Sequence, residues 1–141
     1  DIVMASEKAS FIQAFSKIGL VPDSAGSFFL PRLIGFQKAS ALMLLGDKVS
    51  AAQAQDLGMI YKVFPPETFL QEVHSLALHM AQLPTKALGL TKKLLNASFN
   101  NTLEQQLALE SKLQIQAANS NDYKEGVSAF VEKRKPNFKG N

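Results

Sequence analysis

The chain has 141 residues, a hydrophobic content of 46% and a formal net charge of +3 at pH 7. This length suits one domain or part of one, and the apolar content is enough for a packed core, which excludes a disordered or fibrous protein. The 15 basic and 12 acidic residues are spread along the chain, so we expect no nucleic-acid surface. With no cysteine, disulfides and thiol chemistry are excluded, and no apolar run is long enough to predict a membrane span.

The N-terminal end of the sequence starts abruptly. Residues 2–5 form a β-branched run with no initiator methionine or polar lead-in before it, and the basic and apolar regions of a signal peptide are missing. We therefore expect a fragment of a longer protein. The absence of cysteine fits a reducing compartment, so the expected location is the cytoplasm.

The first part of the chain predicts short strands followed by short helices. Residues 2–5 and 9–15 are extended apolar runs, separated by a turn at residues 6–8. Residues 19–26 form a loop, because Val21-Pro22 disfavours helix and Gly26 interrupts the chain. The next predicted elements are helices over residues 28–34, 36–45 and 51–57, with Ser27 and Ser50 as N-caps and Gly35, Gly46 and Gly58 as ends, and a strand over residues 59–64.

The second part of the chain predicts helices only. Pro65-Pro66 breaks the chain, so we place a boundary between residues 1–64 and residues 65–141. The predicted helices cover residues 67–83, 85–99, 102 onward, and a last helix to about Arg134 capped within Asn119-Ser120-Asn121-Asp122. Amphipathic helices without a sheet must pack on each other, on the first part or on another subunit, so we expect a homo-oligomer.

Asp23 is the candidate reactive group of the first part. It is the only carboxylate between Glu7 and Asp47, and it lies in a Pro/Gly turn flanked by apolar residues. In one interpretation its side chain caps the turn by bonding to the backbone two residues on. In the other, it is a carboxylate in a dry cleft, where its proton affinity approaches that of a weakly acidic carbon. The residues alone leave both interpretations open.

Other candidates for chemistry are weaker. His74 and His79 are separated by roughly 140° around one predicted helix, so they cannot bind the same metal ion. Ser27 lacks the Gly-x-Ser-x-Gly pattern of a nucleophile, and helix capping is the preferred role. The basic run that begins at Lys133 either complements the dipole of the last helix or contacts a phosphate, with Phe130 one turn earlier as an apolar neighbour for a nucleotide base.

Several segments resemble, in the same order, the second half of the crotonase, or enoyl-CoA hydratase/isomerase, superfamily. They are Asp1-Ile2-Val3-Met4-Ala5, Gly19-Leu20-Val21-Pro22-Asp23-Ser24-Ala25-Gly26, Leu30-Pro31-Arg32-Leu33-Ile34-Gly35, Leu57-Gly58-Met59-Ile60 and the ending Lys124-Glu125-Gly126-Val127-Ser128-Ala129-Phe130-Val131-Glu132-Lys133-Arg134. The resemblance covers essentially the whole chain. It implies an α/β fold in which residues 1–64 are the C-terminal part of a ββα spiral core carrying the active-site turn. Residues 65–141 are then an all-helical region that builds trimers or dimers of trimers.

The resemblance also implies a reaction. Members bind a coenzyme A thioester as substrate, with no separate cofactor or metal, and stabilise its enolate with two backbone N–H groups. Hydratases in the family use two glutamates, one of which would fall at Phe15. The position of Asp23 instead resembles that of the aspartate in isomerase members, in particular those that act on the ring epoxide of phenylacetyl-CoA. Asp23 is then the expected acid/base, Phe15 and Pro22 line an apolar wall that excludes water, and Phe130 and Lys133 contact the nucleotide end of coenzyme A.

The sequence departs from the family in its length. Family chains are nearly twice as long, and both oxyanion-hole segments fall in the part absent here, so we expect this chain alone to be inactive. Two alternatives to an isomerase are retained. One is a hydratase in which another acid replaces the one expected at Phe15, and the other is a non-catalytic module whose helices only assemble.

Overall fold

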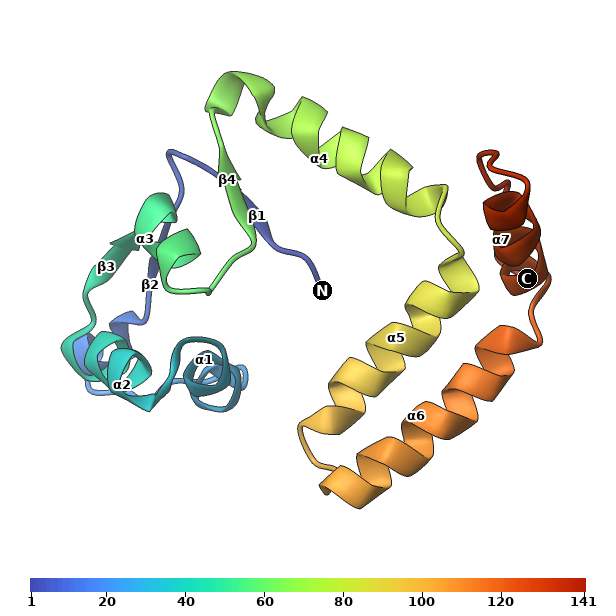
Figure 1. The fold of residues 1–141 in the computed structure, drawn as a ribbon. Coiled ribbons are helices and arrows are strands. Elements are labelled where there is room, and N and C mark those ends of the chain that lie inside the picture. The colour runs from blue at the N-terminus through green and yellow to red at the C-terminus, as the bar shows by residue number, and fades with distance from the viewer. The chain divides into compact units, whose positions relative to one another are not determined.

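The fold consists of seven α-helices, one short 3-10 helix and four short strands (Figure 1). It is described by a computed structural model that covers residues 1–141. The chain divides into two units, Asp1–Val73 and His74–Asn141, and each has its own packing.

The four strands of the first unit form two separate pairs. β1 (Met4–Ser6) runs parallel to β4 (Lys62–Phe64), with Ala5 opposite Val63. β2 (Ser10–Ile12) runs antiparallel to β3 (Lys48–Ser50), with Phe11 opposite Val49. The parallel pair joins the two ends of the unit, because a parallel connection requires a long crossover between its strands.

Short helices fill that crossover. They are η1 (Ala14–Ile18), α1 (Gly26–Ile34), α2 (Phe36–Leu45) and α3 (Ala51–Asp56). α1 packs against α2 and α2 against η1, whereas α3 contacts β2, β3 and β4. The buried centre consists of the small or medium side chains Ala5, Val49, Ala51, Ala54 and Ile60. Large apolar side chains on η1, α1 and α2 stay exposed, including Ile18, Leu33, Phe36 and Leu44.

The structure confirms the predicted N-cap Ser50 and the predicted helix ends Gly35 and Gly46, and it corrects Ser27. Ser50 caps α3 and accepts the N–H of Gln53 at 3.2 Å, while the Gln53 side chain accepts the N–H of Ser50 at 3.0 Å. Ser27 is not a cap, because α1 begins at Gly26 and its N-cap is Ala25. The extended run predicted up to Phe15 ends at Ile12, since the chain turns into η1.

β3 was not predicted, because its three residues are too few to show a strand period. It exists because Val49 can pair with Phe11 and fill the core, a tertiary contact that the local sequence does not encode.

The second unit is built from helices. α4 (Pro66–Ala81) spans the junction between the units, and α5 (Thr85–Ser98), α6 (Leu103–Ala118) and α7 (Asn121–Val131) follow. α5 and α6 lie side by side as a helical hairpin (Figure 1), with Leu90 and Leu113 buried. The Nε2 group of Gln106 fixes the hairpin by donating to the carbonyl of Leu94 at 3.2 Å.

Side-chain caps start the last two helices. Thr102 forms a capping box with Gln105 at the start of α6. Ser120 caps α7 by accepting the N–H of Tyr123 at 3.0 Å, so the cap within the predicted segment is this serine. None of the helices is both long and apolar enough to cross a membrane.

Candidate active site

The turn that carries Asp23 is held at its start by η1. Gly19 ends this helix with φ +73°, in the left-handed region that glycine adopts without steric cost. The N–H of Leu20 then donates to the carbonyl of Phe15 at 2.9 Å. Phe15 stands where the resemblance places a hydratase glutamate, and this bond joins it to the segment that leads to Asp23.

The other end of the turn has unusual backbone geometry. Ser24 and Ala25 are consecutive non-glycine residues with positive φ, at 48° and 60°. The left-handed conformation costs roughly 1–2 kcal/mol for such a residue, and strain of this kind clusters at functional sites. The N–H of Gly26 closes the turn by donating to the carbonyl of Asp23 at 2.8 Å. The backbone therefore fixes the position of Asp23 without using its side chain.

The Asp23 carboxylate is exposed in this chain and takes part in no hydrogen bond or ion pair. The turn-capping interpretation is therefore not what the structure shows. Pro22 and Phe15 are half-buried, and neighbouring side chains are apolar and open, with Val21 80% exposed. A carboxylate with no partner, beside an apolar surface, is suited to take up and return a proton once a substrate covers it.

Gln13 lies against Gly26 at the start of α1 and was not singled out from the sequence. Its Oε1 atom is buried without a hydrogen-bond partner, and a Cβ placed on Gly26 would lie 3.5 Å from it. No sequence motif marks this glutamine. Its contact with Gly26 arises only because η1 brings the chain back to the start of α1.

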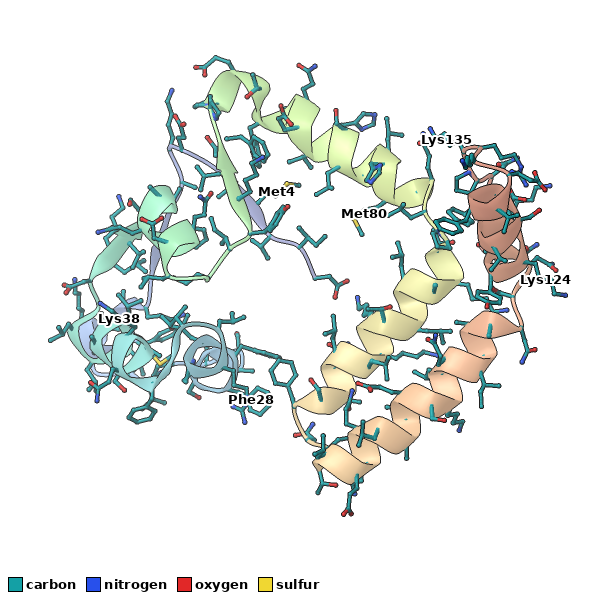
Figure 2. The ribbon with its side chains drawn as sticks, in the orientation of Figure 1. Met4, Phe28, Lys38, Met80, Lys124 and Lys135 are labelled. Atoms are coloured by element: carbon teal, nitrogen blue, oxygen red, sulfur yellow. The ribbon has the colours of Figure 1, made fainter.

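Phe28 and Arg32 cover one side of α1. The Arg32 guanidinium lies 3.7 Å from the centre of the Phe28 ring and donates to the carbonyl of Phe28 at 2.8 Å. Phe28 and Phe29 pack edge to face with their ring centres 5.1 Å apart. Figure 2 labels Phe28 at this helix.

The other two predicted site residues lie at the end of α7, in the second unit. Phe130 is 85% exposed. Lys133 has φ +53°, and the bonds from Lys133 N–H to Phe130 carbonyl at 3.3 Å and from Arg134 N–H to Ala129 carbonyl at 3.0 Å end the helix. Lys133 is thus the left-handed residue that terminates α7, which leaves its ammonium group exposed to meet an anion.

Phe130 forms part of an apolar groove, which we call the α7 groove. Its volume is about 390 Å³, and it is lined mainly by Pro84, Ala87, Tyr123, Val127, Phe130 and Phe138. Lys124 on α7 and Lys135 after it, both labelled in Figure 2, are exposed.

An ion-pair network closes the end of α7. Hydrogen bonds from Arg134, and then from the N–H of Asn137, lower the pKa of Glu125 from 4.5 to about 2. Hydrogen bonds from Arg134 and Ser128 lower the pKa of Glu132 as well. Both carboxylates stay ionised at neutral pH. No group of three or more His, Cys, Asp or Glu side chains is arranged to hold a metal ion.

The fold and the sequence together define the class of protein to which the chain belongs. The sequence matches the family described as enoyl-CoA hydratase/isomerase over residues 1–141, and the chain belongs to that family. The α/β fold agrees, because a crystal structure of an enoyl-CoA hydratase from Bacillus anthracis superposes with a TM-score of 0.95 at 29% identity, covering 100% of this chain and 55% of that chain.

Two curated relatives show how activities vary within the family. A 1,2-epoxyphenylacetyl-CoA isomerase from Escherichia coli (strain K12) is 49% identical over 140 residues, which is 99% of this chain and 53% of the relative. A mitochondrial enoyl-CoA hydratase from Pongo abelii is 40% identical over 139 residues, which is 99% of this chain and 48% of the relative. The chain therefore spans about half the length of the curated relatives it matches.

Proposed function

We propose that the protein carrying this chain is an acyl-CoA isomerase that acts on 1,2-epoxyphenylacetyl-CoA or on the double bond of an enoyl-CoA. The observation that carries the proposal is the Asp23 turn, in which two strained residues and one backbone bond present a carboxylate that has no partner. The 49% identity with a relative named 1,2-epoxyphenylacetyl-CoA isomerase supports the same substrate class.

In the proposed mechanism Asp23 moves a proton between carbons of the acyl group while the thioester is an enolate. Phe15, half-buried beside the turn, keeps this wall apolar, so that a proton returns to carbon and no water is added. The two N–H groups that stabilise the enolate are expected in the half of the relatives' length that this chain does not span. That half would also enclose Asp23, which is exposed here, and this chain alone would be inactive.

Phe130 and Lys133 are proposed to contact the nucleotide end of coenzyme A, which enters as part of the substrate, with no separate cofactor. A homotrimer or dimer of trimers, formed by the helical region over residues 65–141, is proposed as the assembly, and the cytoplasm as the location. The exposed apolar side chains of this region, such as Leu70 at 77% and Leu103 at 75%, support an assembly of this kind.

The test is Asp23→Asn in the full-length protein, with purified 1,2-epoxyphenylacetyl-CoA and a 2-enoyl-CoA as substrates. We expect turnover to fall at least about 100-fold, because the acid/base is lost, while coenzyme A affinity stays unchanged. The product mass separates the alternatives, since isomerisation conserves mass and hydration adds one water. Retained isomerisation by the variant would refute the role of Asp23.

Two other functions give different results. A hydratase would add water to the 2-enoyl-CoA, and a relative named enoyl-CoA hydratase at 40% identity keeps this candidate open. A non-catalytic module would form a defined oligomer in sedimentation and show no coenzyme A binding by calorimetry.

A further inference from the structure

The strained turn that carries Asp23 has no side-chain cap where it enters α1. Ser24 and Ala25 hold left-handed conformations, and such residues persist only where the surrounding structure keeps them in place. Ala25 is the N-cap of α1, and no side chain caps the helix there. The N–H of Gly26 joins the helix to the turn by donating to the carbonyl of Asp23 at 2.8 Å. The position of Asp23 therefore depends on what holds Gly26.

Two side chains from other parts of the first unit lie beside Gly26. A Cβ placed on Gly26 would lie 3.5 Å from Oε1 and 3.6 Å from Nε2 of Gln13, and 3.8 Å from Cε of Met43. These are ordinary contact distances between side chains. Gln13 follows β2, and Met43 lies on α2, which packs beside α1 (Figure 1). The end of the Gln13 side chain therefore faces the first residue of α1.

The backbone of Gln13 leads to the other half of the candidate site. The strand just before this residue pairs with β3, and Gln13 itself is the N-cap of η1. Phe15 lies in η1, and its carbonyl accepts the N–H of Leu20 at 2.9 Å. Gln13 thus links Phe15, through the backbone, to the residue that closes the Asp23 turn, through its side chain.

The polarity of the Gln13 side chain does not explain its place in this arrangement. Its Oε1 atom is buried and has no hydrogen-bond partner. A buried acceptor without a partner destabilises a fold, whereas an apolar group of the same shape does not carry this cost. A shorter side chain would leave the space beside Gly26 unfilled, and the groups around such a space lose their contacts. The length of the side chain is therefore the property that matters at position 13.

We propose that Gln13 is a positioning residue for Asp23, and that it acts through the length of its side chain and not through its amide. The side chain holds Gly26 at the start of α1, and Gly26 holds the carbonyl of Asp23. Without that length α1 can shift toward η1, and the Asp23 carboxylate loses its fixed placement relative to Phe15. The effect on turnover rests on the proposed function, whereas the effect on Gly26 does not.

The first test is hydrogen exchange of the Gly26 amide in the full-length protein. Gln13→Ala and Gln13→Asn shorten the side chain and should speed this exchange at least about fivefold, because the bond to Asp23 opens more often. Gln13→Met keeps the length and should stay within about twofold of the wild type. Gln37→Ala, at an exposed glutamine of α2, is the matched control and should change nothing. Slow exchange in Gln13→Asn together with fast exchange in Gln13→Met would overturn the proposal, because the amide would then be the active feature.

Thermal unfolding gives a second readout that does not depend on Gln13→Ala being folded. Gln13→Met removes the unpaired acceptor, so its Tm should be equal to or higher than that of the wild type. Gln13→Asn keeps an amide but loses packing, so its Tm should be lower. A Tm of Gln13→Met clearly below that of Gln13→Asn would overturn the role of side-chain length.

The functional readout is a split between kcat and KM with 1,2-epoxyphenylacetyl-CoA and a 2-enoyl-CoA. Gln13→Ala and Gln13→Asn should lower kcat about tenfold and leave KM within about twofold, because the proton carrier is displaced and the contacts that bind the thioester are not. Gln13→Met should restore kcat. Unchanged kcat in a variant whose Gly26 amide exchanges fast would overturn the positioning role. If the wild type turns over neither substrate, the proposed function fails, and exchange of the Gly26 amide still decides whether Gln13 holds α1.

Discussion

Arg134 and Glu125 form a two-pronged ion pair at the end of α7, with Nη1 and Nη2 donating to the two carboxylate oxygens at 2.6 and 2.9 Å. The same carboxylate accepts the N–H of Asn137, so this pair also holds the segment that follows α7. The predictions below are for the full-length protein that carries this chain.

The Glu125 pair makes stability depend on pH. The pKa of Glu125 in the fold is about 2, below its ordinary value of 4.5. The contribution of its ion pair to the free energy of unfolding is therefore complete above about pH 4.5 and is lost as the pH falls toward 2. We expect wild type to resist urea better than Glu125→Gln at pH 6, and the difference should shrink between pH 5 and pH 2.5. Glu72→Gln on α4 is the matched control and should show no such narrowing. If the difference in urea resistance between wild type and Glu125→Gln stayed constant over this pH range, the Glu125 ion pair would not be the source of the pH dependence.

The N-cap of α3 should be measurable. Ser50→Ala removes the acceptor for the N–H of Gln53 and should lower the free energy of unfolding by about 1 kcal/mol. Ser27→Ala is the control, because Ser27 lies inside α1 and not at its cap, and should change stability by less than about 0.5 kcal/mol. Equal effects in thermal unfolding would argue against the cap assignment.

Relief of the strained turn should stabilise the protein. Ala25→Gly removes the steric cost of φ +60°, and after the entropy cost of glycine we expect a net gain of up to about 1 kcal/mol. Ala41→Gly inside α2 is the matched control and should destabilise by about 1 kcal/mol. A loss of stability in both variants would show that Ala25 is not strained.

Phe15 is the proposed determinant of isomerisation over hydration. Phe15→Glu places a carboxylate where the family's hydratases are expected to have one, and hydration of a 2-enoyl-CoA should rise at least about tenfold over the wild type. Phe15→Leu keeps the wall apolar and should not hydrate. Chromatography of the 3-hydroxyacyl-CoA product measures the change, and equal hydration by both variants would contradict the prediction.

Lys133 is the proposed phosphate contact. Lys133→Ala should weaken coenzyme A binding by about two- to fivefold in calorimetry, because an exposed cation contributes modestly, and the loss should shrink at high salt. Lys135→Ala, two residues on and also exposed, is the control and should leave the affinity unchanged. Equal weakening by both variants would indicate a diffuse charge effect and no specific contact.

The sequence by itself determined the elements that depend on local chemistry. Proline and glycine positions separate the helices, and Ser50 with Gln53 caps α3 through bonds that span only three residues. Asp23 was singled out in the same way, because a lone carboxylate in a Pro/Gly turn is visible in the sequence, and its catalytic role stays a prediction. The family motifs around it cover the whole chain.

Only the tertiary structure decided the features that join distant residues. β3 forms because Val49 meets Phe11, and Gln13 lies against Gly26 because η1 returns the chain to the start of α1. Asp122 resembled a helix cap in the sequence, yet its carboxylate binds Lys139 and Gly140, which follow 17 and 18 residues later. Such contacts depend on where folding brings the chain, and no local pattern of residues specifies that.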